Sequence, residues 1–384
     1  MSADSLEANL PTGSVPANRH PASRPTHLAP EERVAALTQG LVELLEDAVS
    51  EPWRWQQLLD NSATLWRYSG GNAAMLMVQM QARGKEPPTL VAGYKQWERH
   101  GRYVLKGEHA LWVIAPRTAR TANGTADRTE PMAIAGADES QDLKRSRILG
   151  WRGQAVFDVS QTEGEPLLVP RQASGLVPTN GAGYDELWTS LVDVAGRSGF
   201  AVHTSSSQQS LASGYTNFGR HLVSVGAWLE PEERVAVLAH ELGHVMLHGP
   251  DDKLGQLYGS SEEHRGLAEV EAESVAYTVL KAHGVDRAAQ SSSYLAGWAD
   301  TVLAAEADSI MQSAAGCKLL SRADIAKSVL GRVTSASKCI LDVTGPEGSG
   351  GRLAAVRINT SVDCRQSSPV SGPSVRQSTG VTTT

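Results

Sequence analysis

The chain has 384 residues, a net charge of −7 and a sequence pI near 5.9. This length suits two modest domains with tails, and the acidity taken alone argues against a nucleic-acid-binding protein. No apolar run reaches the roughly 20 residues of a membrane-spanning helix, and the N-terminus lacks the apolar core of a signal peptide. The three cysteines include no C-x-x-C pair and predict reduced thiols, so we expect a cytoplasmic protein without a membrane partner.

Composition divides the chain into two candidate domains of an α+β fold and two tails. Residues 1–32 are rich in Pro, Ser and Ala and predict a disordered tail. A first α+β domain is expected at 33–172, interrupted by a polar loop at about 117–147. After a Gly- and Pro-containing linker, a second domain is expected at 183–335, and residues 339–384 predict a second disordered tail.

The stretch VLAHELGHVMLH, from Val237 to His248, contains the pattern H-E-x-x-H. It lies in a predicted helix of about five turns, which begins at Pro231 and ends before Gly249-Pro250. His240 and His244 are one turn apart on one face, so both imidazoles can reach one metal ion. Glu241 lies beside them, where it can take a proton from water activated by the metal. An amphipathic helix with solvated or core histidines is the alternative explanation.

A catalytic zinc site needs a third protein ligand. His248 is close in sequence but points along the same helix, so we interpret it as a structural or supporting residue. A second predicted helix, HRGLAEVEAESVAYTVLKAHG, carries Glu269 and Glu273 on its small-residue face, where a carboxylate would be buried and would need a cation. Glu271 is predicted to face the solvent. We therefore predict Glu269 as the third ligand and Glu273 as the carboxylate that orients a ligand histidine. Glu271 stays open as the third ligand in place of Glu269, and surface ion pairs with Arg265 or Lys281 are the alternative to a metal site.

Residues 51–120 differ in charge from the rest of the chain. This window has ten basic and five acidic residues, a net charge of +5, which is the local charge that a phosphate backbone would experience. It also holds a large share of the Trp and Tyr residues of the chain: Trp53, Trp55, Trp66, Tyr68, Tyr94, Trp97, Tyr103 and Trp112. Aromatic faces beside a positive groove bind single strands, although a small core with solvated arginines explains the same composition.

The pair HELGHVMLH and EVEAESVAY resembles the zincin-like metallopeptidase domains of the ImmA/IrrE type, and more closely the C-terminal domain of ArdC antirestriction proteins. The resemblance covers roughly residues 184–288. It implies that the glutamate opening the E-x-x-A turn, here Glu269, is the third zinc ligand. It also implies that HLVSVGAWL forms the edge strand before the active-site helix, where an extended peptide can add as a strand.

A second resemblance lies nearer the start. The motifs YSGGN, GYKQW and VLKGEHALWVI, together with the Trp-rich segment before them, resemble those of the single-stranded-DNA-binding domain of ArdC proteins. This resemblance implies a DNA interface in the positive window. Trp112 lies in the apolar run ALWVI and is expected in the core. The candidate contact residues are Trp66, Arg67, Tyr68, Asn72, Lys95, Trp97, Arg99, Arg102 and Lys106.

Together these features predict a protein that binds single-stranded DNA and carries a Zn²⁺ metallopeptidase domain with an unknown protein substrate. The resemblance implies protection of incoming mobile DNA from restriction. Two other functions stay open. One is a regulatory protease of the ImmA/IrrE type that cuts a repressor, and the other is a non-catalytic DNA-binding protein with a structural zinc.

Overall fold

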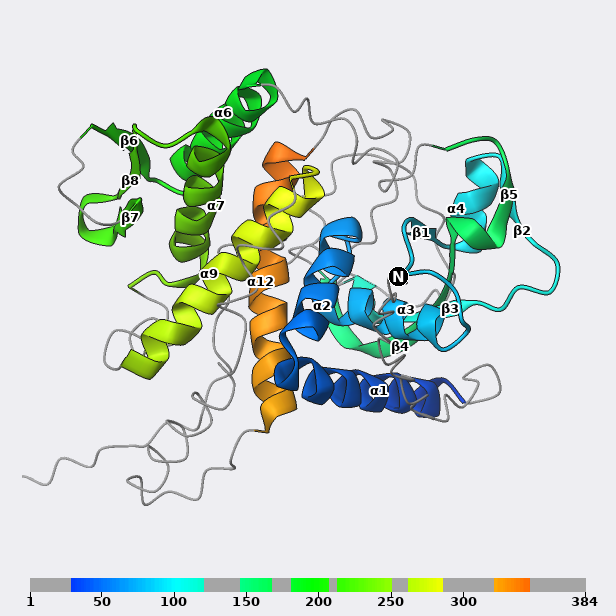
Figure 1. Cartoon of the computed structure of the whole chain (residues 1–384). Helices are drawn as coiled ribbons and strands as arrows, with labels where there is room; N and C mark the ends of the chain where they lie inside the picture. Colours follow the sequence, from blue (N-terminus) through cyan, green and yellow to red (C-terminus); the bar gives the residue numbers. More distant parts are fainter. Residues whose placement is uncertain are drawn as a thin grey trace, which may run out of the picture.

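A computed structural model describes residues 29–120, 146–167, 181–206, 213–250, 262–285 and 321–345. Within these ranges, helices pack with three small sheets, which confirms the predicted α+β class (Figure 1). The predictions for residues 1–28, for the centre of the polar loop and for residues 346–384 lie outside the described part of the chain. Among the described helices, none has the length and apolar character needed to cross a membrane.

The first part of the chain begins with three helices: α1 (Pro30–Ser50), α2 (Pro52–Thr64) and α3 (Gly70–Gln81). Pro30 and Pro52 each lie at the start of a helix, where the missing N–H breaks no intrahelical bond. Because α1 begins at Pro30, the prediction that the N-terminal tail extends to residue 32 is wrong at its boundary. Ser69 caps α3 by accepting the Asn72 backbone N–H.

Short strands and one long hairpin follow these helices. The elements are β1 (Val91–Ala92), α4 (Tyr94–Arg99), β2 (Arg102–Val104), β3 (Leu111–Arg120), β4 (Ser146–Asp158), η3 (Val159–Gln161) and β5 (Thr162–Gly164). β1, β4 and β3 form one antiparallel sheet, and β2 pairs with β5 in another. Since β3 and β4 stay paired to Arg120 and Ser146, the polar loop predicted at 117–147 is shorter than expected at both ends.

The second part of the chain places a mixed sheet next to long helices. It contains α6 (Gly181–Arg197), β6 (Ala201–Ser205), β7 (Gly214–Asn217), η4 (Phe218–Arg220), β8 (Leu222–Gly226), α7 (Pro231–Leu247), α9 (Glu262–Ala282) and α12 (Arg322–Thr344). β8 is the central strand, parallel to β6 and antiparallel to β7. The prediction that β8 is the edge strand is therefore wrong, because both of its sides are already paired.

The helix α12 runs past the point where we expected a disordered tail. It continues to Thr344 and buries Ile340 and Leu341, so the boundary predicted at residue 339 is wrong. Cys339 lies on this helix and is disulfide-bonded, which contradicts the prediction of reduced thiols for this residue. The other two cysteines, Cys317 and Cys364, lie outside the described residues.

One continuous apolar core joins the two parts of the chain. Figure 1 shows α9 beside α12, and α9 also packs against α7 and α2. The core contains Trp55 of α2, Tyr277 of α9 and Ile340 of α12, all at most 2% exposed. Polar bonds cross the same contact, because the Trp55 indole donates to the Ser274 hydroxyl and the Tyr277 hydroxyl donates to Asp60. The helix α9, which carries the candidate ligand Glu269, therefore packs directly on α2.

Candidate metal centre

The helix α7 presents the H-E-x-x-H pattern to α9. It begins at Pro231 with Glu232 and Glu233 in its first turn, which favours the positive end of the helix dipole. The apolar residues Val235, Leu238, Ala239 and Leu242 are buried and fix which face of the helix is inward. This orientation places His240 and His244 side by side at the α7–α9 contact.

Gly243 allows the two ligand-bearing helices to approach closely. A Cβ atom built at this position would lie 2.8 Å from the Cα of Ala272 on α9, closer than real contacts permit. Gly243 therefore lets α9 lie close enough to α7 for a carboxylate of α9 to reach the two histidines.

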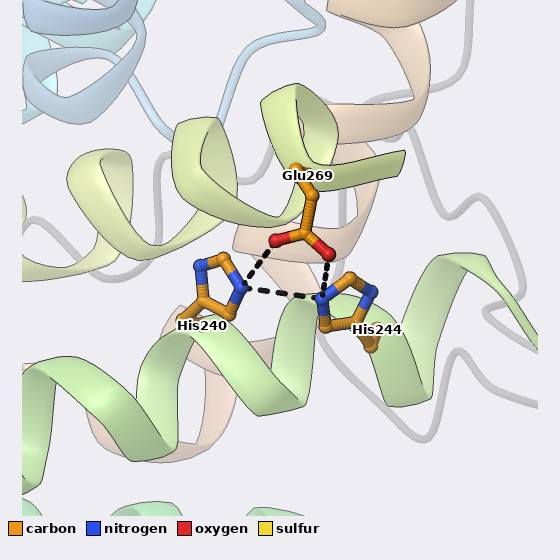
Figure 2. Close-up of side chains that lie close together, drawn as sticks. All are labelled: His240, His244 and Glu269. Atoms are coloured by element: carbon orange, nitrogen blue, oxygen red, sulfur yellow. Dashed lines mark hydrogen bonds and ion pairs between the residues drawn. The ribbon is translucent and has the colours of Figure 1, made fainter. Parts of the chain in front are cut away.

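Glu269 and the two histidines converge on one point (Figure 2). Nε2 of His240 lies 3.2 Å from Nε2 of His244 and 3.2 Å from Oε2 of Glu269. Nε2 of His244 lies 3.5 Å from the other Glu269 oxygen, Oε1. A tetrahedral ion with bonds of about 2.0–2.1 Å separates its ligands by about 3.3 Å. Two imidazole nitrogens and one carboxylate at these separations are a donor set that suits zinc.

The Glu241 side chain is buried and held by the neighbouring sheet. Its Oε2 accepts a hydrogen bond of 2.7 Å from Oγ1 of Thr216 on β7. Gly214 of the same strand lies so close that an added Cβ would approach Oε1 of Glu241 to 3.2 Å. The strand β7 therefore lies directly against the carboxylate that follows the first ligand histidine.

Electrostatic interactions favour opposite charges on His240 and Glu269 in the metal-free chain. Burial lowers the pKa of His240, but hydrogen bonds to Glu269 and Glu273 outweigh this effect and raise its pKa to about 10. Hydrogen bonds from His240 and His244 hold the pKa of Glu269 well below its usual range. A metal cation can replace the proton between these groups, as expected for residues that share one ion.

The other ring nitrogens of the histidines also have partners. Nδ1 of His240 lies 3.3 Å from Oε2 of Glu273, the contact that an orienting carboxylate requires. Nδ1 of His244 lies 2.9 Å from Nδ1 of His248. The prediction that Glu271 faces the solvent is wrong: it is fully buried and contacts His248 and Arg332, whereas the Glu269 side chain is 54% exposed. The helix α12 packs against α9 and buries Glu271, so the burial of Glu269 and Glu271 is the reverse of the prediction. Helical periodicity within α9 holds no information on this contact.

Three of the predicted DNA-contacting residues are buried and have structural roles, so their assignment is corrected. The Tyr68 hydroxyl donates to the Val91 carbonyl, and burial raises its pKa. The Asn72 side-chain amide pairs with the backbone N–H and carbonyl of Ile114. Trp97 is fully buried and donates from its indole to the Phe157 carbonyl. A base cannot stack on a ring that lies inside the core.

The other six candidates fall into two groups. In the first group, Trp66 is half-buried, and the Arg67 guanidinium lies 4.4 Å from the centre of the Trp66 ring. Arg102 donates to the hydroxyl and carbonyl oxygens of Thr162 on β5 and to the Glu165 carbonyl. Lys95, Arg99 and Lys106 are exposed on and around α4 and β2. The three positive charges of this second group therefore lie at the surface.

Sequence reasoning missed the aromatic residues that are most exposed. In the first part of the chain these are Trp53, Tyr94, Tyr103 and Trp151, which are 49–59% exposed. Trp151 on β4 lies outside the window that we considered. Strand alternation along β4 places Trp151 on the face opposite the buried Val156, but the search for contact residues stopped at residue 120.

Two family models match separate segments of the chain. Residues 31–157 match the model of the N-terminal domain of anti-restriction factor ArdC. Residues 195–297, which include all three candidate metal ligands, match the IrrE N-terminal-like domain of peptidase family M78. The chain combines these two domain types.

The chain also has similarity to solved structures of the ArdC protein from the R388 plasmid. The metal-free structure has 17% identity over 72% of this chain and 85% of that chain, with a TM-score of 0.39. The Mn(II)-bound structure has 17% identity over 73% of this chain and 90% of that chain, with a TM-score of 0.36. No curated protein matches the chain.

Proposed function

We propose that this protein is a zinc metallopeptidase that acts near single-stranded DNA, with an antirestriction role. The observation that carries the peptidase half is the arrangement of His240, His244 and Glu269 around one point, with Glu241 beside it. The match of residues 195–297 to a peptidase family supports the same conclusion. A structural zinc would not require a buried glutamate at position 241.

The residues around this point have separate roles in the proposed reaction. A bound zinc ion supplies a Lewis acid that makes water a better nucleophile at neutral pH. Glu241, held by Thr216, accepts the proton of the attacking water and passes it to the leaving amine. β7 lies at an edge of the sheet formed by the described residues, and its free side can pair with an extended peptide next to Glu241.

The Glu241→Gln variant tests the peptidase proposal. The amide keeps the size of the side chain but cannot accept a proton, so the variant should bind zinc as the wild type does and cleave no peptide. Zinc-loaded full-length proteins would be incubated with a peptide library, with and without single-stranded DNA, and products identified by mass spectrometry. Equal cleavage by wild type and variant would remove Glu241 from the mechanism. Zinc binding without any cleavage by the wild type would favour a structural zinc.

Exposed aromatic and basic residues support the DNA-binding half of the proposal. Tyr94 and Tyr103 lie in the same α4–β2 region as Lys95, Arg99 and Lys106, and Trp151 projects from the β3–β4 hairpin. Aromatic faces stack bases without reading sequence, while the cations neutralise phosphates. The match of residues 31–157 to the ArdC N-terminal domain is consistent with this surface.

Single-strand binding is tested in the full-length chain. Tyr103→Ala and Trp151→Ala should each weaken binding by about 1–3 kcal/mol if they stack a base. The matched control is Tyr215→Ala, which removes an aromatic ring that is 48% exposed on β7, outside the ArdC-type segment. Fluorescence anisotropy with a labelled oligonucleotide measures the affinity, which should fall as salt rises. If Tyr103→Ala and Trp151→Ala both bind as the wild type and the control do, this surface is not the interface.

A further inference from the structure

A chain of polar contacts runs from the second ligand histidine to a helix outside both matched segments. Nδ1 of His244 lies 2.9 Å from Nδ1 of His248, and Nε2 of His248 lies 3.0 Å from Oε2 of Glu271. The other Glu271 oxygen, Oε1, accepts from Nε of Arg332 at 2.9 Å. Arg332 lies on α12 and also donates to the Leu247 carbonyl at the end of α7. No residue of α12 belongs to either matched segment.

The position of the metal determines the direction of every hydrogen bond in this chain. If the ion binds Nε2 of His244, the remaining proton of that ring is on Nδ1 and is donated to His248. Nδ1 of His248 must then be an acceptor, so its proton is on Nε2 and is donated to Glu271. Glu271 accepts from both sides, because Arg332 can only donate.

We propose that His248, Glu271 and Arg332 form a positioning relay that fixes the orientation and tautomer of His244 as a metal ligand. The inference rests on the proposed metal site. His240 has a direct carboxylate partner in Glu273, whereas His244 receives the same support from Glu271 through an intervening imidazole. The relay makes α12 part of the metal centre although it provides no ligand.

Burial explains why these three groups depend on one another. Glu271 is fully buried and the His248 side chain is only 7% exposed, so water cannot replace a missing partner for either group. A buried carboxylate without donors is strongly unfavourable, and the bonds from His248 and Arg332 provide them. Removing any member should therefore disturb the orientation of His244 rather than remove a peripheral contact.

Nitrogen NMR of the zinc-loaded wild type tests the relay without any substitution. In protein with ¹⁵N-labelled histidine, multiple-bond ¹⁵N–¹H spectra report which ring nitrogen carries the proton. The relay requires His244 to be protonated on Nδ1 and His248 on Nε2 alone. A His248 ring protonated on Nδ1, or on both nitrogens, would overturn the proposal, because two N–H groups cannot share the contact.

Substitutions at position 248 provide a second test by zinc affinity. Gln can accept from His244 and donate to Glu271, so His248→Gln should bind zinc within about threefold of the wild type. His248→Leu can do neither and should lose about 10–100-fold in affinity, the usual effect of removing a hydrogen-bond partner from a metal ligand. His203→Leu, at an exposed position on β6, is the control. Equal losses for Gln and Leu, or none for Leu, would contradict the relay.

Arg332 tests whether α12 takes part. Arg332→Leu removes one donor to Glu271 and should also weaken zinc binding, whereas Lys327→Leu, at an exposed position of the same helix, should not. Wild-type zinc affinity in the Arg332 variant would exclude α12 from the relay. These outcomes are distinct from failure of the proposed function, because a wild type that binds no zinc would refute the metal site itself.

Discussion

At the scale of single residues, carboxylates around His240 favour its protonated form, and a metal ion must displace that proton. His240 lies between Glu269 and Glu273, and in the metal-free chain its pKa is raised to about 10. The imidazole is therefore protonated at neutral pH when no metal is bound. A metal ion can bind Nε2 only after that proton leaves, so metal affinity and proton affinity are coupled.

This coupling predicts that zinc affinity rises with pH. Below a pKa of about 10, each pH unit makes the proton on His240 about tenfold easier to displace, so this one group should add a tenfold gain per unit between pH 6.5 and 8.5. Chelator competition at several pH values measures the slope. Glu273→Gln removes one carboxylate that raises this pKa and should flatten the slope at the upper end of the range. A pH-independent affinity in the wild type would contradict the coupling.

At this scale the sequence predicted which residues come together, but the burial used to choose Glu269 over Glu271 was wrong. Helical spacing placed His240 and His244 on one face, and the structure brings Glu269 within 3.2 Å of His240. The expectation that Glu269 is buried and Glu271 solvated was wrong, because α12 covers the face of α9 that carries Glu271. Burial depends on packing partners far along the chain, which local periodicity does not contain.

At the scale of elements, the α7–α9 contact depends on Gly243. Alanine would improve the helix propensity of α7 by about 1 kcal/mol, but its methyl group would overlap the Ala272 backbone. Because a backbone atom cannot move aside like the end of a side chain, the helices must separate, and such overpacking costs about 1–3 kcal/mol. The ligand set should widen with them.

We therefore predict that Gly243→Ala lowers both the unfolding free energy and the zinc affinity. Gly331→Ala is the matched control, because an added Cβ on this exposed position of α12 meets nothing within 4 Å. That variant should be more stable than the wild type by about 0.4–1 kcal/mol. Urea unfolding measures both changes. If Gly243→Ala is as stable as Gly331→Ala and binds zinc normally, the close approach does not set the site.

The elements also show where sequence patterns were informative. The helices α7 and α9 were predicted within a few residues, because Pro231 and Gly249-Pro250 mark the ends of α7 and apolar residues recur along both helices. Tyr68 and Trp97 were misassigned because composition cannot distinguish a tryptophan or tyrosine in a small core from one at its surface. The central position of β8 depends on pairing with two strands and was not visible in its own sequence.

At the scale of the whole molecule, the two matched segments share one core. Leu45, Trp55 and Leu58 from the first segment belong to the same apolar cluster as Val275 and Tyr277 of α9. Separating the segments would expose these side chains, each worth about 1.5–3 kcal/mol when buried. Zinc binding at α7 and α9 should therefore stabilise α2 as well.

Hydrogen exchange measures this linkage. Adding zinc should slow amide exchange in α2 (Pro52–Thr64) as well as in α7 and α9, because opening α2 removes the packing of α9. The helix α4, whose Trp97 lies in a separate apolar cluster, is the internal comparison and should respond less. Protection confined to α7 and α9 would show that the two segments fold independently.

The central claim is that His240, His244 and Glu269 hold one zinc ion, and metal content tests it most directly. Elemental analysis of full-length protein after zinc loading and removal of excess metal should give about one zinc per chain. Glu269→Ala should retain almost none, whereas Glu233→Ala, at an exposed position of α7, should match the wild type. A Glu269→Ala protein that still holds a full equivalent of zinc would contradict the account.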